Sequence, residues 1–490
     1  MPKVGMVSLG CPKNLVDSEV MLGTLAGGGW EIVPRAEDAD VLVVNTCSFI
    51  EPAKRESIET ILEMAEHKKS GRLRRLVVAG CLVERYRDKI LEEIPEVDCV
   101  IGTNELERVL EACAFEAAGP KSFGATEPYL YHEFTPRLLA TPSYTAYVKI
   151  AEGCDHPCSF CVIPQMRGRF RSRRFESVRT EVTNLARRGV REITLIGQDT
   201  TSYGEDLSLV NGLATLVREL GKIPELVWLR FLYCYPNRLN NALIAAVAET
   251  PKAAKYFDIP LQHASRNILK LMRRGSDGDH FLKLLDKIRR AIPGVALRTS
   301  FIVGFPGETD ADFRTLLDFV AAAEFDHAGV FLYSNEETSA SYGLPEQVPA
   351  RTVRRRQREL LALQRKISRR KLRTKVGTRL PVLVEGRSEE SDLLFTARTE
   401  GQAPEIDGRV FINDFEGPEP TAGEFRWAKV TEASDYDLVA RLETRTFCQS
   451  GNSEQKAAHD ADRCANDGAG QALRLVNIQR AGLIERPAIP

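Results

Sequence analysis

The sequence lacks the features that mark membrane-spanning, secreted or wholly disordered proteins. Hydrophobic residues make up 43% of its 490 residues and charged residues 28%. No apolar run approaches the roughly 20 residues that a membrane-spanning helix needs. The first three residues, Met-Pro-Lys, lead straight into the strand-like VGMVSLG at 4–10, without the basic and apolar regions of a secretory signal. We therefore expect a cytoplasmic protein with no membrane contact and, at roughly 150 residues per domain, about three domains.

Cysteine is also scarce, and charge of one sign does not dominate. Eleven cysteines are too few for a disulfide scaffold in a chain of this length, and a reducing cytoplasm disfavours disulfides. Metal or redox chemistry is the better use for them. The formal net charge of −1 argues neither for nor against a nucleic-acid partner.

Two series of short apolar runs alternate with helical stretches, which is typical of parallel α/β folds. The first predicts an N-terminal doubly wound parallel sheet in a domain of residues 1–118, with strands at 4–10, 41–46, 75–80 and 97–102. A Gly-, Pro- and Ser-rich linker with one strand at most follows at 119–143. The second series predicts a partial (β/α)6 barrel in a domain of residues 140–375, with strands at 147–153, 192–198, 227–232, 255–261, 296–304 and 328–333.

The C-terminal third of the chain carries two opposite charges. Residues 351–375 predict a basic amphipathic helix with 12 Lys and Arg, one acid and a charge of +11. Short strands in 376–443 predict a small antiparallel β-barrel. Residues 377–443 hold seven Lys and Arg against 15 Asp and Glu, a charge of −8. Residues 444–490 predict a disordered or weakly helical tail.

Three cysteines lie within eight residues, directly after the first strand of the second series. Cys154, Cys158 and Cys161 form CxxxCxxC, and thiolates at this spacing converge on a soft metal, usually an iron–sulfur cluster in the cytoplasm. Three ligands leave one iron of a four-iron cluster open. The alternative is a structural zinc knuckle, but it needs a fourth ligand, and His156 is poorly placed to converge with its neighbours.

CxxxCxxC with an aromatic residue, Phe160, before the last cysteine resembles the radical S-adenosylmethionine superfamily. The resemblance implies that the open iron binds S-adenosylmethionine and that an electron from the cluster generates a 5′-deoxyadenosyl radical. Gly197 and Gln198 stand where relatives bind the methionine amino group with Gly-Gly-Glu. The segment SFIVGFPGE, with Ser300 and Gly304, resembles the part of the family that packs against adenine.

Three more cysteines, far apart in the sequence, each follow a predicted parallel strand of the first series. They are Cys11, Cys47 and Cys81. Groups at the carboxyl ends of parallel strands meet in one crevice, so we expect these thiols to come together. A buried packing cysteine is the alternative for any one of them, but three equivalent positions make it a poor explanation for all.

The N-terminal α/β domain, the radical S-adenosylmethionine barrel and a small barrel like a TRAM module together resemble the methylthiotransferases, over about 440 residues. The resemblance implies two [4Fe–4S] clusters, one on each set of three cysteines. In that family the cluster of the first domain carries the sulfur, one S-adenosylmethionine methylates this sulfur, and a second supplies the radical. Hydrogen abstraction by a radical needs no general base, so no catalytic residue beyond the six cysteines is predicted.

Members of this family modify either an adenosine of transfer RNA or an aspartate of the twelfth protein of the small ribosomal subunit. A module with a charge of −8 repels phosphate and attracts a basic ribosomal protein. The run CPKNLVDSE from Cys11, together with IGQDTTSYG and PQMRG, resembles the ribosomal-protein branch, RimO. We therefore predict an aspartate methylthiotransferase that also needs a reductant protein. Its product would be 3-methylthioaspartate.

Three alternatives stay open beside this prediction. The first is a transfer RNA adenosine methylthiotransferase. The second is a non-enzymatic electron carrier with two clusters, which would need neither the S-adenosylmethionine motifs nor a substrate-binding module. The third concerns the +11 helix, which could contact RNA directly as a secondary interaction, although a packed helix with a basic exposed face explains it equally simply.

Overall fold

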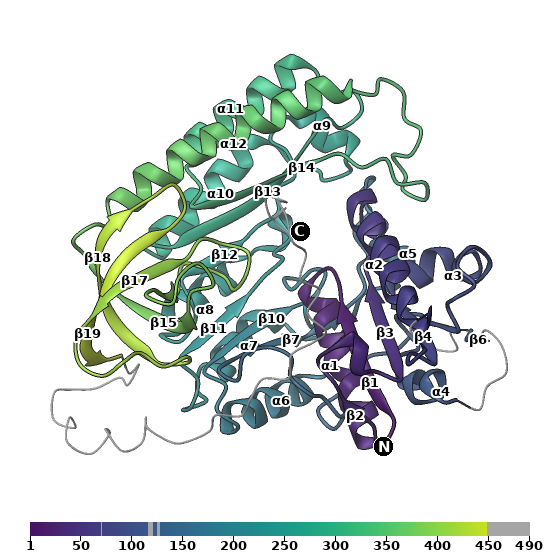
Figure 1. Ribbon diagram of the computed structural model, residues 1–490. Coiled ribbons are helices and arrows are strands. Elements are labelled where there is room, and N and C mark those ends of the chain that lie inside the picture. The colour runs from purple at the N-terminus through teal and green to yellow at the C-terminus, as the bar shows by residue number, and fades with distance from the viewer. Residues whose placement is uncertain (70, 116–120, 125–127, 448–490) are drawn as a thin grey trace.

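The computed structural model describes residues 1–447 except 70, 116–120 and 125–127. The tail predicted for 444–490 therefore lies almost entirely outside the described residues. Figure 1 shows an N-terminal α/β unit, a larger α/β unit beside it, and a C-terminal barrel connected through one long helix. None of the described helices is long and apolar enough to cross a membrane.

The N-terminal unit is a six-stranded parallel sheet in the order β2-β1-β3-β4-β5-β6. Strand residues alternate between two cores: Val7, Leu42 and Val44 pack under α2 and α3, whereas Met6 and Val43 pack under α1 and α4. Helices thus cover both faces, as expected for a doubly wound sheet. The elements are β1 (Lys3–Ser8), α1 (Pro12–Gly27), β2 (Glu31–Ile32), β3 (Val41–Thr46), α2 (Glu51–Lys69), β4 (Arg75–Gly80), α3 (Cys81–Glu93), β5 (Cys99–Ile101), α4 (Val109–Cys113) and β6 (Lys121–Ser122).

The sixth strand lies inside the segment that the composition predicts to be a linker. β6 pairs with β5 through Lys121 and Ser122, so the first sheet extends past residue 118. β6 is the one strand that the sequence allows in this segment, although two residues give no measurable alternation by which to place it.

Six parallel strands form the second unit, as the sequence predicts. They lie in two three-stranded sheets, β11-β10-β7 and β12-β13-β14, with helices outside (Figure 1). The strands are β7 (Thr145–Lys149), β10 (Glu192–Ile196), β11 (Trp228–Phe231), β12 (Tyr256–Asp258), β13 (Ala296–Val303) and β14 (His327–Leu332); β8 (Ala151–Glu152) and β9 (Arg171–Ser172) form a separate ribbon. The helices are α5 (Ile163–Arg167), α6 (Phe175–Arg187), α7 (Gly212–Leu220), α8 (Asn241–Glu249), α9 (Arg266–Leu271), α10 (Gly278–Ala291), α11 (Asp310–Ala323) and α12 (Ala350–Arg373).

The C-terminal unit is a closed five-stranded barrel in the order β15-β16-β17-β19-β18. Its strands are β15 (Arg379–Arg387), β16 (Phe395–Thr399), β17 (Val410–Phe415), β18 (Phe425–Ala433) and β19 (Leu438–Thr446). The expectation of a wholly antiparallel barrel is wrong at one place, because β17 and β19 pair in parallel. Five strands cannot alternate direction all the way round a closed barrel, so one neighbouring pair must be parallel.

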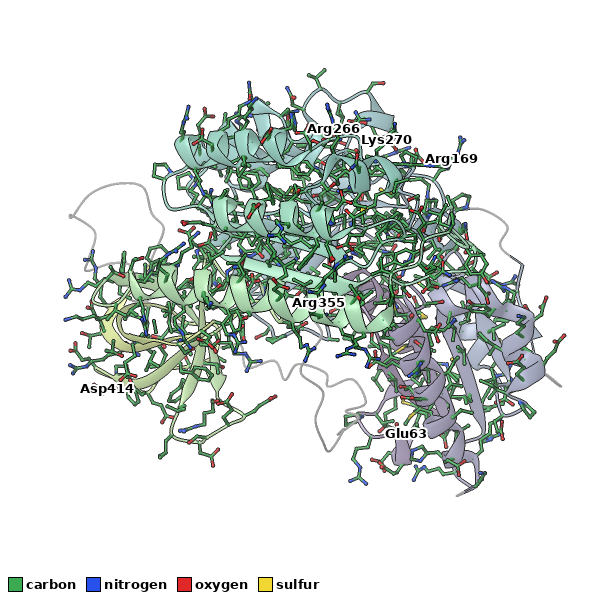
Figure 2. All side chains as sticks on the ribbon, turned by 90° about the horizontal axis from the view of Figure 1, so that it is seen from above. Glu63, Arg169, Arg266, Lys270, Arg355 and Asp414 are labelled. Carbon is green, nitrogen blue, oxygen red and sulfur yellow. The ribbon has the colours of Figure 1, made fainter. Side chains whose placement is uncertain are left out.

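The basic helix α12 is a packed element as well as a charged one. Val353, Leu360 and Ile367 are buried against the second unit, and buried Arg356 donates to the carbonyl oxygen of Glu308 at 3.0 Å. Figure 2 labels Arg355 on this helix and Asp414 on the adjoining barrel. The basic helix meets the acidic barrel near its C-terminal end, where exposed Arg369 pairs with Asp435.

Buried charges attach the small barrel to the strand starts of the second unit. Arg398 of β16 pairs with Glu192, the first residue of β10, at 2.6 Å, and both side chains are at most 2% exposed. Asp407 accepts a hydrogen bond from the Tyr256 hydroxyl at 2.7 Å. This places the small barrel at the end of the second unit opposite the carboxyl ends of its strands, where reactive groups of such folds gather.

Candidate active site

The first-domain thiols, Cys11, Cys47 and Cys81, lie at the topological switch point of the first sheet. Cys11 follows β1 and caps α1, while Cys81 begins α3 directly after β4. The strand order changes direction between β1 and β3, which opens the crevice where such sheets bind ligands. The structure brings the three together: the Cys47 side chain packs against Gly10, next to Cys11, and the Cys81 Sγ lies 3.7 Å from Asn14 Oδ1 in the first turn of α1. Burial and the nearby Cys81 and Cys11 raise the pKa of the Cys47 thiol.

Glycines make the close approach of the first-domain thiols possible. A Cβ atom on Gly10 would lie 2.7 Å from the Cys47 Cβ and 3.0 Å from its Sγ, and one on Gly80 would lie 2.3 Å from the Asn45 Oδ1. Both glycines have positive φ, which other residues adopt only with strain. The Asn45 side chain donates to the Asn14 carbonyl oxygen at 2.9 Å, so it supports the first turn of α1, as its position suggests.

The loop thiols, Cys154, Cys158 and Cys161, lie beyond the first strands of the second unit. The Cys154 amide donates to the Gly168 carbonyl oxygen at 3.2 Å, and Arg274 donates to the Cys158 Sγ at 3.5 Å. Burial raises the pKa of the Cys154 thiol to about 12. A thiol with this pKa is protonated at neutral pH, so a metal that binds Cys154 must displace its proton.

The two other loop residues singled out by the sequence hold the loop in place. Phe160 packs partly buried against Ile268, Met272 and Phe305. His156 Nε2 lies 2.7 Å from the Asp199 Oδ2, and its ring stacks on Tyr235 at a centroid distance of 3.7 Å. His156 is thus engaged away from the thiols, in keeping with its poor placement as a zinc ligand.

A buried polar bridge of Asn14, Asp17, Lys149, Glu152, Arg167 and Gln198 joins the first-domain thiols to the second unit. At one end, the Cys81 Sγ lies 3.7 Å from the Asn14 Oδ1. Arg167 donates to that same Asn14 oxygen.

The bridge continues through a pair of buried carboxylates. Arg167 donates to Asp17 at 2.6 Å, and Lys149 donates to Asp17 at 2.5 Å and to Glu152 at 2.6 Å. Gln198 donates to the other Glu152 oxygen at 2.6 Å. Burial raises the pKa of Glu152, but Lys149 and Arg167 lower it more, so this pKa lies below its ordinary value and the carboxylate stays charged.

The residues predicted to line an S-adenosylmethionine site divide into two groups. The Gln198 Oε1 is buried and lacks a partner among the described residues, as an acceptor for an absent ammonium group would. A Cβ added to buried Gly197 would make only ordinary van der Waals contact, with the Ala151 carbonyl oxygen at 3.5 Å as its nearest neighbour. These two fit the predicted role.

Ser300 and Gly304 are placed by packing. Ser300 is buried within β13, and its carbonyl oxygen accepts from the Gln262 amide at 2.8 Å. A Cβ on Gly304 would lie 2.5 Å from a Val353 methyl of α12. Because its φ is +82°, Gly304 permits the turn and the close packing of α12; contact with adenine stays a prediction.

The donor chemistry of both thiol groups fits iron–sulfur ligation. All six cysteines are free thiols. In residues 1–447, apart from the short gaps, no group of His, Cys, Asp and Glu is arranged to hold one metal ion. Ligands to different irons of a cluster lie farther apart than ligands around a single zinc, which are all about 2.3 Å from the metal. The assignment of the six cysteines as cluster ligands stays a prediction.

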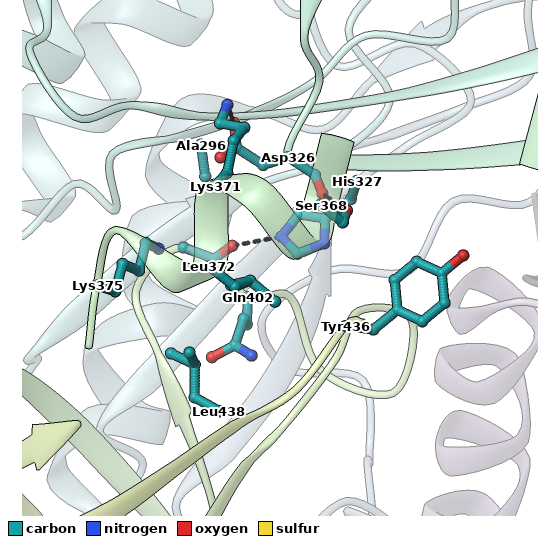
Figure 3. A pocket seen from close by; sticks show the side chains of 11 residues that line it. Ala296, Asp326, His327, Ser368, Lys371, Leu372, Lys375, Gln402, Tyr436 and Leu438 are labelled. Atoms are coloured by element: carbon teal, nitrogen blue, oxygen red, sulfur yellow. Dashed lines mark hydrogen bonds and ion pairs between the residues drawn. The ribbon is translucent and has the colours of Figure 1, made fainter. Parts of the chain in front are cut away.

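One pocket lies away from both thiol groups. Figure 3 shows it between α12, the start of β13 and the small barrel, where the His327 Nε2 lies 2.9 Å from the Gly401 carbonyl oxygen. Lys371 and Lys375 line it together with Gln402. None of the six cysteines lines this pocket, so it is a feature of the unit boundary and separate from the candidate active site.

Sequence reasoning missed the residues that connect the two thiol groups. Asn14, Asp17 and Arg167 stand in motifs that resemble the ribosomal-protein branch, but the motifs alone give them no role. Lys149 and Glu152 flank the cysteine loop as ordinary strand residues, although charged residues inside an apolar strand are a signal of buried pairing. Arg274, which contacts Cys158, lies over a hundred residues away from it and has no such signal.

Comparison with known families assigns all three units. The model of the Radical SAM superfamily matches residues 148–320, that of the TRAM domain matches 376–442, and that of the Uncharacterized protein family UPF0004 matches 3–102. A solved radical S-adenosylmethionine methyltransferase, TsrM from Kitasatospora setae, shares the fold at 16% identity with a TM-score of 0.50, over 70% of this chain and 77% of that one. Fold and site together define a radical S-adenosylmethionine enzyme.

Curated relatives show which family of radical S-adenosylmethionine enzymes the chain resembles. Proteins named ribosomal protein uS12 methylthiotransferase RimO match over 90% of this chain at 62% identity in Solibacter usitatus, covering 94% of that protein, and at 55% in Koribacter versatilis, covering 96%. The relative of that name in Myxococcus xanthus is 46% identical over 93% of this chain and 95% of its own length. The chain belongs to the RimO methylthiotransferase family.

Proposed function

We propose that this protein replaces a hydrogen on the β-carbon of an aspartate of ribosomal protein uS12 by a methylthio group, giving 3-methylthioaspartate. The observation that carries the proposal is the buried polar bridge, which connects the first-domain thiols to Gln198 at the end of β10. A reaction that inserts sulfur at a radical carbon needs the sulfur-carrying site and the radical-generating site to reach the same substrate. An electron carrier needs only a route for electrons between its two clusters.

The first-domain thiols would hold one [4Fe–4S] cluster and the loop thiols a second, with S-adenosylmethionine beside Gly197 and Gln198. When bound, these groups supply a methylated sulfur and a 5′-deoxyadenosyl radical that abstracts hydrogen. The residues of the chain position them: Arg274 places a positive charge at Cys158, and Phe160 covers the loop with apolar surface. We infer that a cytoplasmic reductant protein supplies the electron.

The charge of the small barrel supports a basic protein as substrate. Its exposed acids Glu389, Glu390 and Asp392 form one loop, and a surface of this sign attracts a ribosomal protein and repels phosphate. The names of the relatives also favour uS12 over transfer RNA. Direct contact of α12 with RNA is secondary in this proposal, because packing of the apolar face of α12 against the second unit is enough to explain why this helix is present.

Mass spectrometry of ribosomes from cells with and without the gene tests the proposal. We expect one aspartate of uS12 to carry the mass of an added SCH₂ unit, and this mass to disappear on deletion. Restoring the gene should restore it, whereas a gene with the loop thiols replaced by alanine should not. If the deletion removes a methylthio group from transfer RNA and leaves uS12 unchanged, the proposal is wrong and the adenosine branch is right.

A further inference from the structure

Lys13 connects the first-domain thiols to the second unit by a route separate from the buried polar bridge. It stands two residues after Cys11, in the first turn of α1, and is 7% exposed. Its Nζ lies 3.4 Å from the centre of the Tyr233 ring. Tyr233 follows β11 and its carbonyl oxygen accepts from the Thr200 amide at 3.1 Å, two residues beyond Gln198. The ammonium group therefore lies between the start of α1, beside Cys11, and the segment that follows β11 in the second unit.

Lys13 differs from the other buried cations nearby because no carboxylate lies beside its ammonium group. Arg167 pairs with Asp17 at 2.6 Å and Lys149 pairs with Asp17 and Glu152. Within the part of the chain that the structure describes, Lys13 forms no ion pair with a carboxylate. Its ammonium group contacts the Tyr233 side chain, through the ring face and a hydrogen bond, and lies near the Cys11 thiol. These contacts offset only part of the cost of burying an ammonium group, so the site favours an incoming carboxylate.

We propose that Lys13 binds the side-chain carboxylate of the substrate aspartate and so holds the adjacent β-carbon between the two thiol groups. The inference rests on the proposed function, because it needs an aspartate as substrate. That carboxylate is one bond away from the reacting carbon, so the group that binds it must lie at the reaction centre. Arg167 cannot serve, since Asp17 and Asn14 already occupy its guanidinium group.

The binding of two peptides to the reconstituted enzyme tests the proposal. One peptide is the uS12 segment with its target aspartate, and the other replaces that aspartate by asparagine; both carry a fluorescent label for anisotropy. Wild-type enzyme should bind the aspartate peptide about 10 to 100 times more tightly than the asparagine peptide, as expected for a hydrogen bond between two charges. Lys13→Met should bind both equally weakly, and Lys13→Arg should recover part of the preference.

Two controls separate this role from others. Lys287→Met, an exposed change on α10, should leave the preference intact. Iron content and the electron paramagnetic resonance spectrum of Lys13→Met should match wild type, which excludes a role in building the first-domain cluster. A preference for aspartate that survives in a folded Lys13→Met overturns the inference, as does equal binding of both peptides by wild type. Wild-type enzyme that binds the aspartate peptide but never methylthiolates it refutes the proposed function instead.

Discussion

The two thiol groups are built in opposite ways. The loop thiols come from one stretch of eight residues, so local chain geometry brings them together and α9 merely supports them. The first-domain thiols follow three separate strands, and only the parallel register of β1, β3 and β4 makes them neighbours. A site built by a loop can tolerate some loosening of the fold, whereas a site built by a sheet depends on it. Changes that act on one group alone test this difference.

The largest expected effect comes from removing one thiol from each group. Cys158→Ala should abolish formation of 5′-deoxyadenosine, because the loop thiols generate the radical. Cys47→Ala should spare it and abolish methylthiolation. Each variant should lose about half the iron, since each holds one of two clusters. Liquid chromatography of the nucleoside, iron analysis and mass spectrometry of uS12 measure the three quantities.

Cys234→Ala is the matched control, because Cys234 is a fully buried thiol outside both groups. Its iron content and activities should stay at the wild-type level. If Cys47→Ala loses 5′-deoxyadenosine as completely as Cys158→Ala, the two groups do not act separately. Unchanged iron in both variants would refute the assignment of the ligands.

Arg167→Met should have the next largest effect, on stability. It leaves the buried carboxylates of Asp17 and Glu152 with Lys149 as their remaining cation, and breaking such a buried pair costs roughly 3 to 5 kcal/mol of the free energy of unfolding. Urea unfolding followed by circular dichroism measures it. Arg169→Met, two residues away and exposed (Figure 2), should change it by less than about 0.5 kcal/mol. Similar losses in both variants would show that the bridge is not stabilising.

Much of the fold could be predicted because strand patterns are local. Strands β3 and β4 occupy the predicted residues 41–46 and 75–80, and all six barrel strands lie within or beside their predicted ranges. The place of β6 within the linker could not be predicted because the strand has only two residues. The parallel pairing of β17 with β19 could not be predicted because the closure of a barrel is not a local property.

The candidate active site also has features that could be predicted from the sequence and features that could not. The proximity of the first-domain thiols could be predicted because each thiol follows a parallel strand, and the topology of the sheet brings the ends of those strands together. The buried polar bridge could not be predicted, because Asp17 and Arg167 are 150 residues apart and charge pairing across a domain boundary leaves no periodicity. Gly304 stands in a segment that resembles a family motif. Its close contact with Val353 could not be predicted, because Val353 belongs to a helix some fifty residues later in the sequence.

Gly80→Ala should destabilise the first-domain group by a smaller amount. Gly80 has a φ of +95°, and the new methyl group would lie 2.3 Å from Asn45 Oδ1 and 2.7 Å from the Thr46 carbonyl oxygen. Strain of this kind costs roughly 1 to 3 kcal/mol. Iron bound by the first-domain cluster should fall with it, whereas formation of 5′-deoxyadenosine should persist. Wild-type stability and iron would show that the sheet tolerates movement at Cys81.

Gly197→Ala should have the smallest effect on stability. Any change in S-adenosylmethionine binding by this variant can therefore be assigned to the cofactor site itself. Its φ lies outside the left-handed region and the nearest atom to a new methyl group is 3.5 Å away, so the free energy of unfolding should change by less than about 0.5 kcal/mol. If Gly197 lines the S-adenosylmethionine site, that methyl group instead occupies cofactor space, and calorimetry should show weaker S-adenosylmethionine binding. Gly27→Ala, where an added methyl group meets nothing within 4 Å, should leave S-adenosylmethionine binding unchanged. Unaltered cofactor affinity in Gly197→Ala would remove this residue from the site and leave Gln198 as the contact at the end of β10.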